Sequence, residues 1–192
     1  MSSGVDLGSG PALARAMVAA YQVRALTDGE RAVAEETLRF IDANPDCLWR
    51  TCQTGHLTGS AWIVDPSRRR TLLTLHRKLG KWLQLGGHAD GEAHLSEVAL
   101  RETREESGLE SVRLVSADLF DLDRHWIPER RGDAGHHHYD FRFLVEADDR
   151  APLIVSDESH QLAWVDLDDV HRLNHEPSLL RLVQKTRERS GR

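Results

Sequence analysis

Hydrophobic positions near the start of the chain recur with the spacing of amphipathic helices. Residues 11–26 predict one helix, because Pro11 suits the first helical turn. A second helix is predicted over 27–44, where Thr27 and Glu30 have the spacing of a capping box. Its apolar stripe consists of Val33, Ala34, Leu38, Phe40 and Ile41. The pattern therefore predicts an N-terminal helical pair, which could be a lid, a packing element or a dimer contact.

Beyond this pair, the pattern changes to short β-rich runs around one central helix. Strands are predicted at 59–65, 70–78, 112–121, 137–147 and 162–167. Helices are predicted at 95–107 and 177–189. Strands that flank a helix, with further helices at both ends, indicate an α+β fold, an α/β/α sandwich with a mixed β-sheet. We expect a flexible N-terminus (1–10), a helical extension (11–45) and a main domain (46–192).

Length and charge restrict the class of protein. The chain has 192 residues, enough for one domain with a small extension. Its net charge of −6 argues against broad binding to nucleic acid or to anionic membranes, but it does not exclude a small phosphorylated ligand in a local basic pocket. We find neither an apolar run of about 18 residues nor the features of a signal peptide, so we expect a cytoplasmic protein. Cys47 and Cys52 are expected to be reduced core thiols.

Three glutamates give the predicted helix at 95–107 an unusual acidic face. Glu102, Glu105 and Glu106 share one side of the helix, where like charges at i,i+4 repel each other. Either this face is solvated or a cation sits against it. A glycine-rich loop precedes the helix, and glycine lets a backbone carbonyl approach a metal closely. Carboxylates together with such a carbonyl would suit Mg²⁺.

This stretch resembles the signature of the Nudix hydrolase superfamily, G-x5-E-x7-R-E-U-x-E-E-x-G-U, where U is a bulky apolar residue. The C-terminal half of the signature is matched by Arg101, Glu102, Glu105, Glu106, Gly108 and Leu109, with Thr103 at a position that is usually aliphatic. Counted from Gly87, the first glutamate of the signature falls on Ala93, one place after Glu92. Counted from Gly86, Glu92 is in register but one extra residue precedes Arg101. The resemblance covers about residues 46–175 and implies a Nudix-type sandwich.

The resemblance also implies roles for the residues of the signature. Glu102, Glu105 and Glu106 would bind Mg²⁺ or Mn²⁺, with Glu102 also a possible catalytic base. Arg101 would orient the carboxylates through a salt bridge, and the Gly86 carbonyl would be a further metal ligand. In the family, the R-E-x-x-E-E core provides most of the metal binding, and the earlier glutamate of the signature more often has a supporting role.

A second acidic segment precedes the predicted strand at 162–167. Glu158 lies about six residues before Trp164, where several Nudix subfamilies place a metal-proximal glutamate or the catalytic base. The alternative is an exposed acidic loop. Trp62 and Trp164 are expected in the core, since both lie within predicted strands.

Histidines supply further candidates. His136, His138 and Asp140 share one face of a predicted strand and could bind a transition metal, although we favour a substrate-lining role for His138. His88, directly after the glycine pair, could contact substrate or a metal-bound water, or it could stabilise the loop through backbone hydrogen bonds. These alternatives remain open from sequence.

Cations and aromatic side chains near the glycine loop are candidates for substrate binding. Arg77 could receive substrate phosphates, although an ordinary surface role is the alternative for any one such cation. Trp82 and Trp126 could stack on a nucleobase.

These observations predict a Mg²⁺- or Mn²⁺-dependent hydrolase. It would cleave the pyrophosphate bond of a nucleoside diphosphate linked to another moiety, such as a nucleotide sugar, ADP-ribose, a dinucleotide or a nucleoside triphosphate. The alternative is a non-catalytic Nudix ligand-binding or sensor module. For the protein as a whole, the expected partner is a small nucleotide-type substrate. We expect no binding to nucleic acid or to a membrane, and a homodimer is possible.

Overall fold

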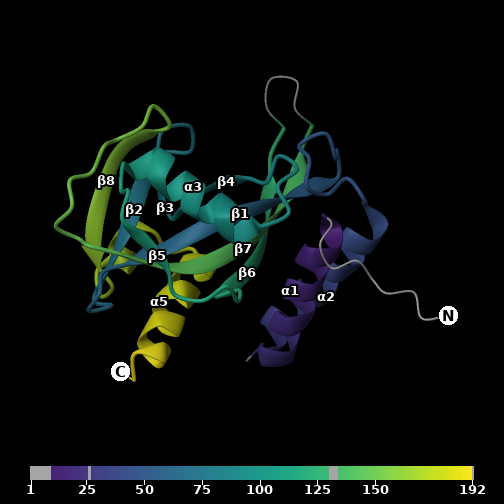
Figure 1. Cartoon of the computed structure of the whole chain (residues 1–192), viewed down its shortest axis with the longest axis horizontal. Helices are drawn as coiled ribbons and strands as arrows, with labels where there is room; N and C mark the ends of the chain where they lie inside the picture. The colour runs from purple at the N-terminus through teal and green to yellow at the C-terminus, as the bar shows by residue number, and fades with distance from the viewer. Residues whose placement is uncertain (1–9, 26, 130–133, 192) are drawn as a thin grey trace. The chain divides into compact units, whose positions relative to one another are not determined.

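The computed structural model describes residues 10–25, 27–129 and 134–191 (Figure 1). All but the last residue of the predicted flexible segment 1–10 lies outside this part. The chain forms two compact units. Unit 1 takes its residues from Met1–Gly59, Gly87–Val98 and Asp118–Arg142, and unit 2 from Ser60–Gly86, Ala99–Ala117 and Phe143–Arg192.

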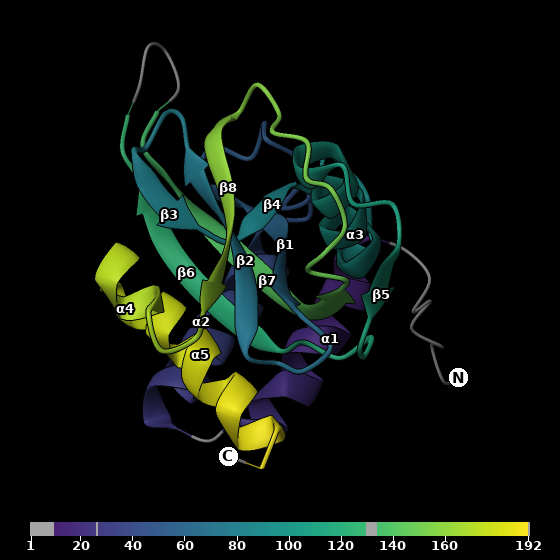
Figure 2. The same cartoon turned by 90° about the vertical axis from the view of Figure 1, so that its left-hand side faces the viewer.

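Unit 1 begins with the predicted helical pair, which is confirmed. Helices α1 (Pro11–Arg24) and α2 (Asp28–Ala43) lie side by side (Figures 1 and 2). The capping box is complete, because the Glu30 backbone N–H donates to Thr27 Oγ1 at 3.2 Å and the Thr27 N–H donates to Glu30 Oε2 at 3.0 Å. Tyr21 on α1 donates its hydroxyl hydrogen to Glu30 at 3.0 Å, and this bond links the two helices.

Two antiparallel strands form the sheet portion that lies wholly in unit 1. Strand β6 (Asp121–Ile127) pairs with the first half of β7 (His136–Ala147). The predicted strand at 112–121 is therefore wrong over most of its length: only β5 (Val112–Leu114) and Asp121 are extended in the sheet. The intervening apolar residues Leu119 and Phe120 are buried without strand pairing, so their hydrophobicity reflects packing in a loop.

Unit 2 is organised around β2 (Arg70–His76). This strand pairs antiparallel with the end of β1 (Gly55–Val64), with β3 (Lys81–Leu83) and with β8 (Ser159–Asp166). A turn connects β1 to β2. It is held by Asp65, whose carboxylate accepts hydrogen bonds from the backbone N–H groups of the following residues, Ser67, Arg69 and Arg70.

Helix α5 (Pro177–Arg189) belongs to unit 2 and buries Leu179, Leu182, Val183 and Thr186. Thr186 Oγ1 accepts a 2.8 Å hydrogen bond from Nε1 of Trp62, which is fully buried. The core position predicted for Trp62 is thereby confirmed. The four-residue helix α4 (Val170–Leu173) precedes α5 and was not predicted.

Two elements that position the candidate site draw residues from both units: β4 (Leu85–His88) and α3 (Leu95–Ser107). Helix α3 ends where expected, since Gly108 has the left-handed φ of 71°. Hydrogen-bonded neighbours run in the order β3-β2-β1-β7-β5, with β4 beside β1, β6 beside β7 and β8 beside β2. The predicted fold class, a mixed sheet with helices and an N-terminal helical pair, is confirmed.

The cysteines are free and buried, as expected. Burial raises the pKa of the Cys47 thiol to about 12, which makes it unreactive. Among the described helices, none has the length and apolar character required to cross a membrane.

Candidate metal and catalytic site

The second half of α3 presents the acidic residues of the signature. The opposite side of this turn is buried, with Thr103 and Ser107 fully inaccessible. The Thr103 hydroxyl donates to the Ala99 carbonyl at 2.8 Å, so a polar residue is satisfied within the helix at a position where the signature expects an aliphatic one. The departure at Thr103 therefore leaves the helix and its acidic face in place.

Glu106 is the most deeply placed of these glutamates, with 7% of its surface exposed. Its Oε1 accepts a 2.9 Å hydrogen bond from the Gly86 backbone N–H on β4. Burial raises the pKa of Glu106 to about 8; the Gly86 hydrogen bond opposes this shift, and the charges of Glu102, Glu158 and Glu105 add to it. The site thus concentrates negative charge around a carboxylate that is costly to ionise without a nearby cation.

Arg101 lies beside the carboxylates in the way the resemblance implies. Its Nη2 is 2.8 Å from Glu102 Oε1, and its Nε is 4.0 Å from Glu105 Oε1. The guanidinium therefore fixes the Glu102 carboxylate and only approaches that of Glu105, which is more exposed.

Gly86 is required by close backbone packing. A Cβ built at this position would lie 2.2 Å from Ser60 Oγ and 2.6 Å from Ser60 Cα. Any side chain would push β4 away from Ser60 and would disturb the N–H that binds Glu106.

The donor set suits Mg²⁺ or Mn²⁺, because hard cations prefer carboxylate and carbonyl oxygens. A cation would also offset the burial cost and the added repulsion that together raise the pKa of Glu106. Among the described residues, the only group of three potential metal-ligand atoms within 4.8 Å of one another consists of histidine nitrogens. The carboxylates of the three glutamates are not gathered in this way, so their side chains would have to rotate to share one cation. Most of the Glu105 side chain is exposed, which leaves room for such a rotation.

Glu92, the displaced glutamate of the signature, has a local structural role. Its Oε1 accepts the His94 backbone N–H at 2.8 Å, directly before α3 begins. This hydrogen bond is the main cause of the lowered pKa of Glu92. The carboxylate therefore stabilises the loop that enters the helix.

Glu158 is exposed in the loop before β8, and its charge reaches Glu106, whose pKa it helps to raise. Arg77 lies beside this loop: its backbone N–H donates to the Glu158 carbonyl at 2.9 Å, and its Nη2 donates to the Ser159 carbonyl at 3.1 Å.

Trp82 is half-buried in β3, where its carbonyl accepts a hydrogen bond from Asn174. Stacking by the Trp82 ring remains a prediction.

Unit 1 gathers the histidine candidates. The rings of His88 and His138 are 5.0 Å apart in an edge-on arrangement. Burial lowers the pKa of His88 to about 4 and that of His138 to about 2, so both imidazoles are neutral near pH 7. His56, which the sequence did not single out, lies 4.7 Å from His138 and 4.9 Å from His88, measured between ring centroids.

Asp140 does not join these histidines as a ligand. Its carboxylate binds Arg142 Nε at 2.7 Å and accepts the Thr58 hydroxyl at 2.9 Å. The H-x-H-x-D pattern therefore separates into two histidines that face His56 and an aspartate that belongs to a buried ionic network.

Comparisons with known proteins identify the family of the chain. The sequence model of the NUDIX domain matches residues 56–186, and the chain belongs to the Nudix family. No curated protein matches the chain. A Nudix-family hydrolase from Clostridium perfringens is 26% identical, with a TM-score of 0.52 over 68% of this chain and 95% of that one.

Two other solved structures share the fold at lower identity. The MutT protein of Methanosarcina mazei is 18% identical, with a TM-score of 0.55 over 73% of this chain and 99% of that one. The Ap4A hydrolase of C. elegans is 17% identical, with a TM-score of 0.53 over 67% of this chain and 93% of that one. Family and fold together assign the chain to the hydrolases that act on pyrophosphate-containing substrates.

Proposed function

We propose that the chain hydrolyses the pyrophosphate bond of a nucleoside diphosphate linked to another moiety, with Mg²⁺ or Mn²⁺ bound by Glu102, Glu105, Glu106 and the Gly86 carbonyl. The observation that carries the proposal is the state of Glu106. A carboxylate that is 7% exposed and surrounded by three other glutamates needs a cation in order to remain ionised at neutral pH.

The chemistry divides among the residues of this site. When bound, a divalent cation would neutralise the diphosphate and polarise its phosphoryl oxygens. Arg101 holds the Glu102 carboxylate in one orientation. Glu102 and Glu158 are the two candidates for accepting the proton of the attacking water, whose oxygen bonds to one phosphorus as the bridging P–O bond breaks.

The substrate class is proposed from the family and from the substrates after which its fold relatives are named. Fold relatives include an Ap4A hydrolase from C. elegans and a dihydroneopterin triphosphate pyrophosphohydrolase from E. coli. Both names describe phosphoanhydride compounds of different size, and substrate choice within one fold is set by the loops and strands around the site. A nucleotide sugar, ADP-ribose, a dinucleoside polyphosphate and a nucleoside triphosphate are the compounds to test.

The test is a panel of these compounds with Mg²⁺ or Mn²⁺, in which products are identified by mass spectrometry. We expect cleavage at a phosphoanhydride bond of at least one compound, with loss of turnover when a chelator removes the metal. Tight binding of one compound without cleavage of any of them would contradict the proposal and indicate a sensor module.

A further inference from the structure

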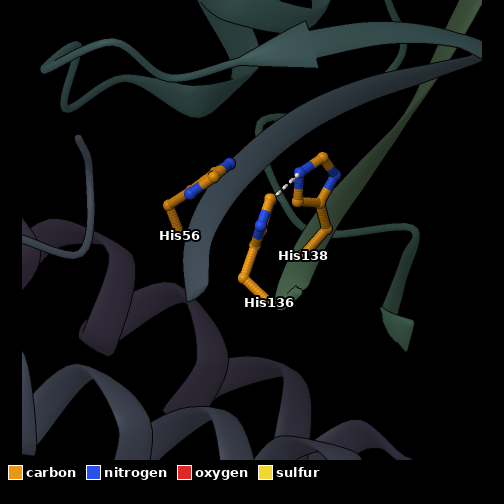
Figure 3. Close-up of side chains that lie close together, drawn as sticks. All are labelled: His56, His136 and His138. Atoms are coloured by element: carbon orange, nitrogen blue, oxygen red, sulfur yellow. Dashed lines mark hydrogen bonds between the residues drawn. The ribbon is translucent and has the colours of Figure 1, made fainter. Parts of the chain in front are cut away.

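Three histidines from two distant parts of the sequence meet in unit 1. His56 is the second residue of β1, and His136 and His138 are the first and third residues of β7. One ring nitrogen from each residue lies within 4.8 Å of the others (Figure 3). The three rings point toward one another, although two come from one strand and the third from another (Figure 3).

The environment of the His56 imidazole leaves both of its ring nitrogens unsatisfied within the described residues. Only 3% of its surface is exposed, and neither ring nitrogen has a hydrogen-bond partner among the described residues. A buried imidazole without partners is costly, because each desolvated polar atom loses its hydrogen bonds to water. A metal ion bound through one nitrogen would remove part of this cost.

His136 is oriented for metal binding by a backbone carbonyl. Its Nδ1 is 2.8 Å from the Ala134 carbonyl oxygen, which can only accept a hydrogen bond, so Nδ1 carries the hydrogen. In a neutral imidazole, Nε2 then has a lone pair. Metal-binding histidines commonly use a backbone carbonyl in this way to fix the tautomer and the ring orientation.

The spacing of the His136 and His138 nitrogens matches one shared ion. Their Nε2 atoms are 3.3 Å apart. Two nitrogens at about 2.0–2.1 Å from a tetrahedral Zn²⁺ would be separated by about 3.3 Å.

We propose that His56, His136 and His138 form a binding site for a divalent transition metal of the Zn²⁺ type. The site shares no ligand with the carboxylates of α3, and its nitrogen donors select a different class of ion, since imidazole suits Zn²⁺, Cu²⁺ and Ni²⁺ whereas carboxylate suits Mg²⁺. Three protein ligands leave one tetrahedral position for water or another exchangeable ligand. The ion would also hold the start of β1 against the start of β7.

The first test measures metal binding by the full chain. The protein is stripped with a chelator and titrated with Zn²⁺ by calorimetry in a large excess of Mg²⁺, which occupies oxygen sites. We expect the wild type to bind one equivalent of Zn²⁺ tightly. In His136→Ala and in His138→Ala, the affinity for Zn²⁺ should be at least roughly 100-fold weaker. This is more than the loss expected when only a hydrogen-bond partner of a metal ligand is removed. Binding of Co²⁺ should give the strong visible absorption of a tetrahedral nitrogen site.

His137→Ala is the matched control. His137 lies between the two ligands on the same strand, but its ring packs against Trp126 at 4.8 Å. This variant and Glu106→Gln should retain the Zn²⁺ equivalent, and Zn²⁺ should raise the unfolding temperature of the wild type but not that of His138→Ala. Absence of Zn²⁺ binding in the wild type, equal loss in His137→Ala, or loss in Glu106→Gln alone would overturn the proposal.

Discussion

Arg142 is the residue on which the buried ionic network of unit 1 depends. Its guanidinium lies 2.7 Å from Asp140, 3.3 Å from Asp121 and 3.2 Å from Asp123, and almost none of it is exposed. Asp121 also accepts the Tyr21 hydroxyl at 3.3 Å. One arginine therefore balances several buried carboxylates and, through Tyr21, reaches the N-terminal helical pair.

Replacement of Arg142 by methionine should destabilise the protein severely. The substitution leaves buried carboxylates without a cation, and breaking such a pair costs about 3–5 kcal/mol. Urea unfolding followed by circular dichroism measures this loss. Arg113→Met is the matched control, because the ion pair of Arg113 with Glu146 is largely exposed and should contribute at most about 1 kcal/mol. Similar losses in the two variants would contradict this account.

Gly86→Ala tests whether close packing positions the site. The added methyl group would meet Ser60 and displace the N–H that binds Glu106, so we expect reduced stability together with a lower kcat. Gly29→Ala is the control: an added Cβ there lies 3.9 Å from the nearest atom, and alanine in a helix is favoured over glycine by about 1 kcal/mol. Wild-type kcat in Gly86→Ala would show that this packing does not position the site.

At the scale of elements, the capping box at the start of α2 gives a defined stability prediction. Thr27→Ala removes the side chain that accepts the Glu30 N–H, and we expect a loss of about 1 kcal/mol in the free energy of unfolding. Thermal unfolding measures it. Glu35→Ala, an exposed change in the same helix, should have little effect, and a loss in Glu35→Ala as large as that in Thr27→Ala would argue against a capping contribution.

The elements differ in how well the sequence predicts them, depending on whether their stabilising contacts are local. The helical pair was predictable because Thr27, Glu30 and the apolar stripe agree on the same boundaries. Strand β6 was missed because Asp121–Ile127 is rich in charged residues. Its aspartates pair with Arg142, a partner on another strand that periodicity cannot reveal.

The candidate site likewise contains residues that the sequence predicts and residues that it does not. Spacing along one helix placed Glu102, Glu105 and Glu106 on the same face, and a hydrogen bond from the Gly86 N–H holds Glu106 against β4. His56 could not be predicted as a site residue, since a single histidine ahead of the predicted strand at 59–65 has no local signal. Its partners on β7 come much later in the sequence, so only the folded chain identifies the cluster.

For the whole molecule, the buried histidines make stability depend on pH. The folded-state pKa values of His56, His88 and His138 lie below the ordinary value of 6.5, at about 4, 4 and 2. Between about pH 4 and 6.5 the unfolded chain binds more protons than the folded one, so this contribution to stability is complete above about pH 6.5 and is lost as the pH falls.

We therefore expect the urea midpoint of the metal-free protein to fall between pH 7 and pH 5. His88→Asn should reduce this dependence, whereas His175→Asn, which changes an exposed histidine, should not. A midpoint that is constant over this range, or a dependence on pH that is unchanged in His88→Asn, would contradict the assignment of neutral buried imidazoles.

The central claim is that the carboxylates of α3 support metal-dependent cleavage of a phosphoanhydride bond. The most direct measurement compares kcat for the best substrate at saturating Mg²⁺ in the wild type, Glu106→Gln and Glu97→Gln. Glu97 is an exposed glutamate in the first turn of the same helix and is the matched control. We predict that kcat falls by at least roughly 100-fold in Glu106→Gln and is unchanged in Glu97→Gln. A wild-type kcat in Glu106→Gln, or an equal fall in both variants, would contradict the account.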